Sequence, residues 1–103
     1  MFVAKVTGSV VSTQKVPAMV GQKLMVVEPY RLESKKRESL TATGRTFIAV
    51  DTIGAGEGDY VLITQGSSAR LTEETQKLPI DTVIVGIVDT VHVDTGWVYS
   101  REA

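Results

Sequence analysis

The stretch Val83-Ile84-Val85-Gly86-Ile87-Val88 decides the fold class of this chain. β-Branched residues dominate it, and they favour strands over helices. Successive side chains of a strand point to opposite faces, so this strand would be apolar on both. A fold interior can take one set, and the other would face water in a single molecule, which favours a subunit interface on the outer wall. One set is Val83, Val85 and Ile87, and the other is Ile84 and Val88; either could face the interior. A loop or the C-terminal segment folding back over that wall is the alternative.

Short apolar bursts separated by turn residues run along the rest of the chain. The pattern predicts strands at residues 2–12, with an interruption at Gly8, and at 23–28, 46–52, 59–65, 81–93 and 97–99. Pro29 should end the second strand because proline cannot donate to a central ladder. The stretch Gly54-Ala55-Gly56-Glu57-Gly58 should join the third and fourth strands as a hairpin. Ser67 is placed to cap a short helix that Pro79 limits.

These elements predict a mostly β fold, a small closed OB-like β-barrel of five or six strands with one short helix. Closure removes the exposed edges that an open sheet would leave, and a small sandwich is the competing fold. The 103 residues fit one domain, residues 1–103. Residues 29–45 lack apolar periodicity and are expected to form a flexible loop, and residues 94–103 a C-terminal tail or an extra strand.

Composition weakens several classes of function. Eleven basic residues face twelve acidic ones, for a net charge of -1, so no bulk field attracts nucleic acid or a membrane surface. The absence of cysteine excludes disulfides and suits a reducing cytosol. The N-terminal stretch lacks the pattern of a secretory signal, and no apolar run approaches the roughly 20 residues of a membrane-spanning helix. The sequence therefore indicates a cytoplasmic protein that does not enter a membrane.

Four blocks of sequence, in order along the chain, share the pattern of one known family. They are Gly8-Ser9-Val10-Val11-Ser12-Thr13-Gln14-Lys15 with Gly21-Gln22-Lys23-Leu24; Val50-Asp51-Thr52-Ile53-Gly54-Ala55-Gly56-Glu57-Gly58-Asp59; Gly66-Ser67-Ser68-Ala69-Arg70; and Pro79-Ile80-Asp81 with Val85-Gly86-Ile87-Val88-Asp89. In these blocks the chain resembles the bacterial microcompartment vertex proteins, the EutN/CcmL family. The resemblance covers nearly the whole chain and lapses in residues 29–45 and after about Asp94.

The resemblance implies a structural protein without catalytic activity, cofactor or metal. Its members form homopentamers of OB-like barrels that occupy the five-fold corners of a polyhedral shell. The implied partners are copies of this chain, in a head-to-tail ring that closes by rotation, and hexameric shell proteins, with neither nucleic acid nor membrane. The implied location is the microcompartment shell within the cytoplasm.

The resemblance also points to particular residues. Gly54, Ala55 and Gly56 should form a tight turn in which glycine permits a positive φ or a close approach. A second group, near subunit contacts, should form a turn and a short helix, with a guanidinium that can bind a neighbour's carboxylate or carbonyl. This group is Gly66, Ser67, Ser68, Ala69 and Arg70. Asp81 matches the family, as Asp51 and Asp89 do; whether these carboxylates pair across an interface or cap backbone stays open. The candidates on the outer wall are Ile84, Val85 and Ile87.

Sharper chemical interpretations find less support. A nucleotide loop at residues 54–58 would need glycine where Asp59 stands and a helix afterwards. A small hydrolase is a third hypothesis, with a triad of Ser67 or Ser68, His92 and one of the Asp residues, but neither serine lies in a GxSxG turn. His92 and Asp94 alone make too few ligands for a usual zinc site, and an exposed histidine is the simpler interpretation.

The alternative function from another class is an OB-fold single-stranded nucleic-acid-binding protein. Its basis is a basic stretch within residues 31–45, which carries a net +3 once its two glutamates are subtracted. Single-strand grooves also use stacking aromatics. The aromatic residues here are few and scattered along the sequence, which favours a solvated loop over a binding groove.

Overall fold

The computed structural model describes residues 1–12, 17–32, 39–66, 71, 81–93 and 96–101. The elements are β1 (Phe2–Val10), η1 (Pro17–Met19), β2 (Lys23–Leu32), β3 (Leu40–Ala42), β4 (Phe47–Asp51), β5 (Tyr60–Gln65), β6 (Thr82–Ile87), β7 (Thr90–Val93) and β8 (Gly96–Ser100). The molecule is elongated, with extents of 47 × 24 × 24 Å. The mostly β composition is confirmed.

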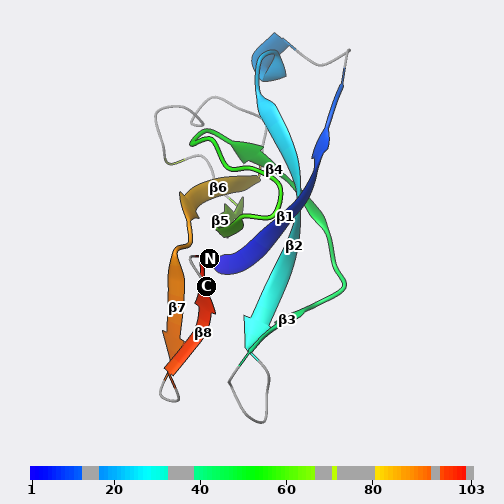
Figure 1. Ribbon diagram of the computed structural model, residues 1–103. Coiled ribbons are helices and arrows are strands. Elements are labelled where there is room, and N and C mark those ends of the chain that lie inside the picture. Colours follow the sequence, from blue (N-terminus) through cyan, green and yellow to red (C-terminus); the bar gives the residue numbers. More distant parts are fainter. Residues whose placement is uncertain (13–16, 33–38, 67–70, 72–80, 94–95, 102–103) are drawn as a thin grey trace.

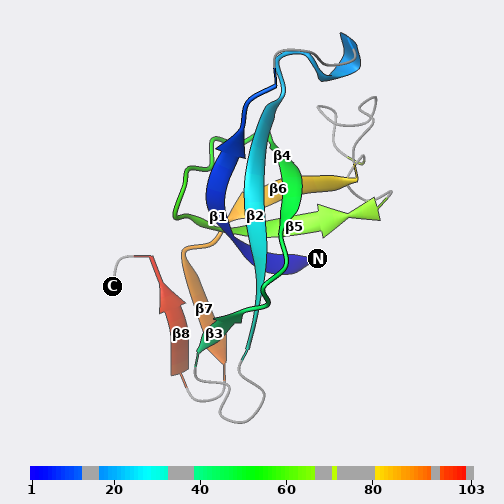
Figure 2. The same ribbon diagram turned by 90° about the vertical axis from the view of Figure 1, so that its right-hand side faces the viewer.

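The main sheet closes on itself as a barrel. Its strand order is β1-β5-β6-β4-β2-β3, and β1 also pairs with β2, so β3 stands outside the closed ring of five strands. The β4–β6 pair is parallel and the other pairs are antiparallel. Figure 2 shows β5 and β6 running across the direction of β1 and β2. The predicted small closed barrel is thereby confirmed, and the sandwich is excluded.

One end of the molecule is the β1–β2 hairpin, which extends past the barrel to η1, and the other end carries β3 and the β7–β8 hairpin (Figure 1). The predicted interruption of the first strand is present, because the β1–β2 register shifts between Val6 and Gly8. In the described part of the chain the helical element is the short 3-10 turn η1. The helix predicted to start at Ser67 lies outside the described residues.

The prediction of a hairpin across residues 54–58 is wrong. Strand β4 pairs with β2 and β6, whereas β5 pairs with β1 and β6, so β4 and β5 are not neighbours. The reason is that the connecting loop, residues 52–59, crosses the barrel instead of reversing tightly. It places Ala55 in the core with no exposed area.

The boundaries predicted around Pro29 are also wrong. Strand β2 continues through Pro29 to Leu32 and forms a hairpin with β3, so residues 29–45 are not all loop. The missing N–H is tolerated because Pro29 lies opposite Ala4, where the β1–β2 ladder ends. Its carbonyl is used on the other side, where it accepts hydrogen bonds from Thr43 N at 3.1 Å and Thr43 Oγ1 at 2.9 Å.

The long strand predicted over residues 81–93 is two strands. Strand β6 ends at Ile87, and the chain then turns away into β7, which pairs with β8 in a separate two-stranded sheet. The Val88 N–H donates to the Tyr60 carbonyl at 2.8 Å at this change of direction. The terminal strand predicted at residues 97–99 is β8.

Candidate assembly surface and the loop that closes the barrel

Strand β6 carries apolar side chains on both faces, but a bulge changes which residues share a face. Leu62 pairs with Gly86 and Ile63 pairs with Ile84, so Val85 is the extra residue in the β5–β6 ladder. Ile84 is 1% exposed in the main core, and Ile87 packs against that same core. The two predicted sets, which assumed uninterrupted alternation, are therefore wrong, because a bulge shifts the phase by one residue.

The outer side of the barrel wall holds a second apolar cluster, called here the outer-wall cluster. It contains the buried Val50 and Val83 and, packed against them, Met19, Leu24 and Val85. Leu24 pairs with Val50 and Val50 pairs with Val83, so these residues form one cross-strand row over β2, β4 and β6. Ile48 lies on the same face of β4 as Val50 and is 50% exposed.

Sequence reasoning placed all its wall candidates on β6 and missed the contribution of β2 and β4. Of the three candidates, Val85 is half-buried on the outer wall, while Ile84 and Ile87 contribute to the core. Val83 is already covered within the single chain, at 1% exposure. Ile48 and Val85 are partly exposed and available to a neighbour, as are Leu24 and Val26 of β2. The run Leu24-Met25-Val26-Val27, which is apolar on both faces of a strand, was a signal for a second wall contribution from β2.

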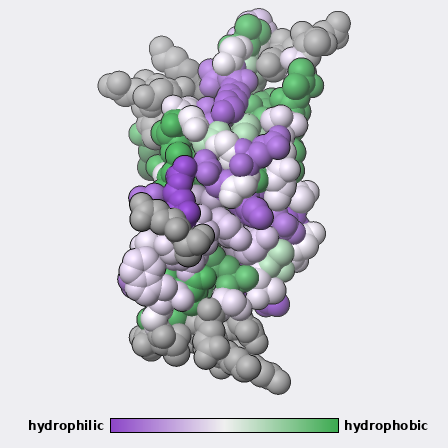
Figure 3. All heavy atoms as spheres, in the orientation of Figure 1, coloured by the Kyte–Doolittle hydropathy of each residue, from purple (hydrophilic) through white to green (hydrophobic). Residues whose placement is uncertain are grey.

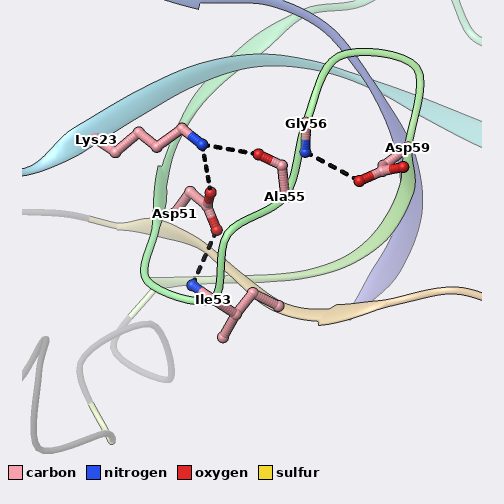
Figure 4. A network of polar contacts seen from close by, with 6 residues as sticks. All are labelled: Lys23, Asp51, Ile53, Ala55, Gly56 and Asp59. Atoms are coloured by element: carbon pink, nitrogen blue, oxygen red, sulfur yellow. Dashed lines mark hydrogen bonds and ion pairs between the residues drawn. The ribbon is translucent and has the colours of Figure 1, made fainter.

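An ion pair between a half-exposed lysine and a buried carboxylate holds the loop of residues 52–59 against the barrel wall. Lys23 and Asp51 lie opposite each other on β2 and β4, with Lys23 Nζ 3.3 Å from Asp51 Oδ2. The Asp51 side chain has no exposed area, and its Oδ2 accepts no hydrogen bond from the residues that the structure describes, so the ammonium of Lys23 compensates its charge. Lys23 Nζ also donates to the Ala55 carbonyl at 2.9 Å, and Ile53 N donates to Asp51 Oδ1 at 3.1 Å. Figure 4 shows these contacts converging on the loop.

The other end of this loop is attached to β1. Gly58 N donates to the Val6 carbonyl at 2.8 Å, and Val6 N donates to the Asp59 carbonyl at 2.9 Å. Within the turn, Gly56 N donates to Asp59 Oδ2 at 2.9 Å. The loop is thus fixed at both ends, with Ala55 buried between them, and it spans from β4 to β5 as a lid over the core. The sequence left open whether Asp51 pairs across an interface or caps local backbone. Its buried carboxylate accepts a hydrogen bond from Ile53 N, so it caps local backbone.

The glycines of this loop have different roles. Gly54 has φ of 87° and Gly58 has φ of 90°, in the left-handed region where a side chain is strained. Gly56, which the resemblance pointed to for the same reason, does not have a positive φ, and a Cβ there would meet only Asp59 Oδ2 at 3.9 Å. The expectation of a positive φ is therefore confirmed for Gly54 and wrong for Gly56.

The second group of candidates is described only in part. Gly66 has φ of 70°, and its N–H donates to the Asp81 carbonyl at 2.8 Å. The Asp81 carboxylate accepts a hydrogen bond from Thr82 Oγ1 at 3.3 Å, so within the single chain it binds its own strand. Ser67, Ser68, Ala69 and Arg70 lie outside the described residues.

A cluster of tyrosines joins the β7–β8 hairpin to the barrel. Tyr60 of β5 packs between Tyr30 and Tyr99, with ring centroids 5.3 Å and 4.3 Å away. Burial raises the pKa of the Tyr99 hydroxyl, although the nearby Arg101 opposes that shift. Burial, followed by the neighbouring Tyr60 and Glu28, raises the pKa of Tyr30. These rings, scattered along the sequence, pack on one another and are not a row of separate stacking platforms.

Two further contacts fix the hairpin. Arg101 Nη2 lies 3.5 Å from Asp59 Oδ1, and Arg101 N donates to the Asp89 carbonyl at 2.7 Å. Asp59 therefore uses one carboxylate oxygen for the loop and the other for the hairpin. Asp89 contributes its backbone here.

The described residues add no support for a hydrolytic triad or a metal site at His92. His92 is exposed and packs on Trp97, with ring centroids 4.3 Å apart. Its predicted partners Ser67, Ser68 and Asp94 lie outside the described residues. Across the residues that the structure does describe, no group of three or more His, Cys, Asp or Glu side chains is placed to hold a metal ion. In the same part of the chain, no helix is long and apolar enough to cross a membrane.

Comparisons with known proteins agree with the fold. Residues 1–89 match the model of a family described as ethanolamine utilisation protein EutN/carboxysome. The bacterial microcompartment shell vertex protein PduN of Salmonella typhimurium is 44% identical over 90 residues, which cover 87% of this chain and 97% of the relative. The structure of Gloeobacter violaceus CcmL is 37% identical, covers 100% of both chains and has a TM-score of 0.89. The GrpN pentameric microcompartment shell protein from Rhodospirillum rubrum is 43% identical, with a TM-score of 0.74, covering 90% of this chain and 98% of GrpN. With matches of this extent, the chain belongs to the EutN/CcmL family.

Proposed function

We propose that this chain is a structural vertex protein of a bacterial microcompartment shell and that it assembles as a homopentamer. The observation that carries the proposal is the near full-length match, in sequence and in structure, to proteins named as shell vertex proteins, one of them described as pentameric. The role is one of assembly, so the functional residues are those that hold the barrel's shape and those that meet neighbouring copies.

The outer-wall cluster, together with the neighbouring cross-strand pair Val26 and Ile48, supports the homopentamer. Ile48 is half exposed on β4, and Val85, Leu24 and Val26 of the neighbouring strands are half-buried. Removing such side chains from water stabilises an association by about 1.5–3 kcal/mol for a fully buried residue, and by less for these partly covered ones. In a head-to-tail ring this wall would be one of the two patches that each copy contributes.

A charge at this wall tests the placement of the interface. The Ile48→Lys variant should fold as a barrel, because half of this side chain already faces water, but a buried unpaired ammonium should break the ring. Val85→Lys should act in the same direction. Thr41→Lys, at an exposed β-branched residue of β3, is the matched control. An unchanged assembly mass for both wall variants would place the interface elsewhere.

The role in the shell predicts a partner of defined symmetry. Hexameric shell proteins tile a flat sheet, and a five-fold component supplies the curvature that closes it, so the pentamer would contact hexamers around its perimeter. Co-expression with a hexameric shell protein should give closed polyhedral particles in electron micrographs, and omission of this chain should give open sheets or tubes. Equal numbers of closed particles with and without the chain would contradict the vertex role.

A further inference from the structure

A head-to-tail ring needs two different patches on every copy, and the wall around the outer-wall cluster supplies one of them. Two copies that met through the same patch would close as a pair, so the other patch has to lie on a different side of the barrel. On the face that Figure 3 shows, apolar surface gathers in separate areas with hydrophilic side chains between them. The chain thus offers more than one apolar surface to a neighbour.

The outward face of β5 carries a leucine where a solvated strand would carry a polar residue. Val61 and Ile63 are fully buried in the main core, so Leu62 between them points out of the barrel. On β1, Val3 precedes the fully buried Ala4 and points outward for the same reason. Val3 and Leu62 lie directly opposite each other, and both are half-buried. Antiparallel strands with a solvated face usually alternate apolar and polar residues, so this pair favours cover by another surface.

Gly86 of β6 extends this pair and keeps its surface low. It lies opposite Leu62 on the side away from Val3. A Cβ at Gly86 would stand 3.4 Å from Leu62 Cδ1 and 3.7 Å from Leu62 Cβ, so the leucine side chain lies over the glycine. The φ of Gly86 is outside the left-handed region, so the close approach of Leu62, and not the backbone conformation, favours glycine here. Val3, Leu62 and Gly86 are called here the β5 row.

The β5 row and the outer-wall cluster lie on different sides of the barrel. In the closed ring of five strands, β5 pairs with β1 and β6, whereas the outer-wall cluster crosses β2, β4 and β6. Ile48 adjoins that cluster on β4 and is 50% exposed, so it projects from the wall. Leu62, in contrast, lies flat over Gly86. A projecting side chain of one copy would therefore meet a low apolar surface on the next.

We propose that the β5 row is the second patch of the ring and that it contacts the wall around Ile48 of the next copy. The occupant is a second copy of this chain, because a relative of 43% identity is described as pentameric and a ring of equal copies needs two unlike surfaces on each. Both surfaces lie within residues 1–89, the part of the chain that matches the family model. Contact between them would remove further apolar area from water. The inference rests on the homopentamer proposed above and names the surface by which one copy receives the next.

The test uses cysteine cross-linking of the assembled full-length protein, which has no cysteine of its own. The chain with both Ile48→Cys and Leu62→Cys is treated with a short bismaleimide after native mass spectrometry has confirmed its assembly. Each interface then holds one cysteine of each kind, so a denaturing gel should show a ladder of linked chains up to the full ring. Either single variant should remain unlinked, and the two single variants co-expressed should give linked pairs only. Ile48→Cys with Thr41→Cys, at an exposed residue of β3, is the matched control and should give no ladder.

A second cysteine position keeps the outcome decisive. If Leu62→Cys prevents folding or assembly, Val3→Cys, in the same row, replaces it and should also give a ladder with Ile48→Cys. A pentamer that gives no ladder with either position would overturn this inference and leave the vertex role standing. Linked pairs from Ile48→Cys alone would also overturn it, because the copies would then meet through the same patch, and so would an equal ladder from the Thr41→Cys control. A monomeric unaltered chain would contradict the proposed vertex role itself.

Discussion

Replacing Lys23 with methionine should destabilise the barrel more than any other substitution of an exposed lysine or arginine among the described residues. The side chain of Lys23 is 51% exposed, but its Nζ compensates the fully buried Asp51 and holds the Ala55 carbonyl. Methionine keeps most of the aliphatic stem and removes the charge. The Asp51 carboxylate would then remain in the wall without the cation that, among the described residues, is paired with its Oδ2.

The magnitude follows from these contacts. Removing one partner of a fully buried pair costs about 3–5 kcal/mol, and a hydrogen bond to a charged group contributes about 1.5–3 kcal/mol. Because water reaches half of the Lys23 side chain, the loss should lie at or below the lower end of the range for a fully buried pair, at about 2–3 kcal/mol. For a domain of this size that corresponds to a fall in melting temperature of roughly 10 °C.

The assay is urea denaturation of the assembled protein at fixed chain concentration. Arg31→Met, at an exposed position of the same strand, is the control and should change stability by less than about 0.5 kcal/mol. The double variant Lys23→Met with Asp51→Asn should regain about 1 kcal/mol over Lys23→Met, because the uncompensated charge is then gone. Equal stability of Lys23→Met and Arg31→Met would refute the clamp.

Three further experiments test the fold. Gly54→Val should cost about 1–3 kcal/mol because φ is 87° there, whereas Gly56→Ala should be nearly neutral; equal losses in thermal melts would contradict the assigned conformations. Ile84→Ala should cost about 2–5 kcal/mol as a core truncation, and a loss below 1 kcal/mol by urea titration would mean that this side chain lies outside the core. Because burial raises the pKa of Tyr99 above its ordinary value near 10, the unfolded chain loses this proton first. Stability should therefore fall as pH rises from about 10 through the folded pKa, and Tyr99→Phe should show a smaller fall; an identical pH profile would remove this assignment.

The class of fold followed from local pattern. Five barrel strands were predicted near their observed positions because alternation and β-branched residues mark strands wherever they pair. Pairing itself was mispredicted at residues 54–58, since a glycine-rich connection resembles a hairpin turn in sequence. The burial of Ala55 decides against a hairpin, because this residue packs into the main core. Strand β3 was missed because its three residues are too few to show a period.

The candidate site was predicted less completely than the fold. The Lys23–Asp51 pair joins two strands that are distant in sequence, and only the β2–β4 register brings these residues opposite each other. The bulge at Val85 moved Ile87 to the face of Ile84, which a strict period of two cannot anticipate. The outer-wall cluster likewise depends on the order of three strands. Each of these features is set by tertiary pairing, which local sequence does not encode.

The mass of the unaltered assembly tests the central claim most directly. Native mass spectrometry at micromolar chain concentration should show one dominant species of about 55 kDa, five times the 11.1 kDa chain. A persistent monomer, or a closed assembly of another copy number, would contradict the vertex role.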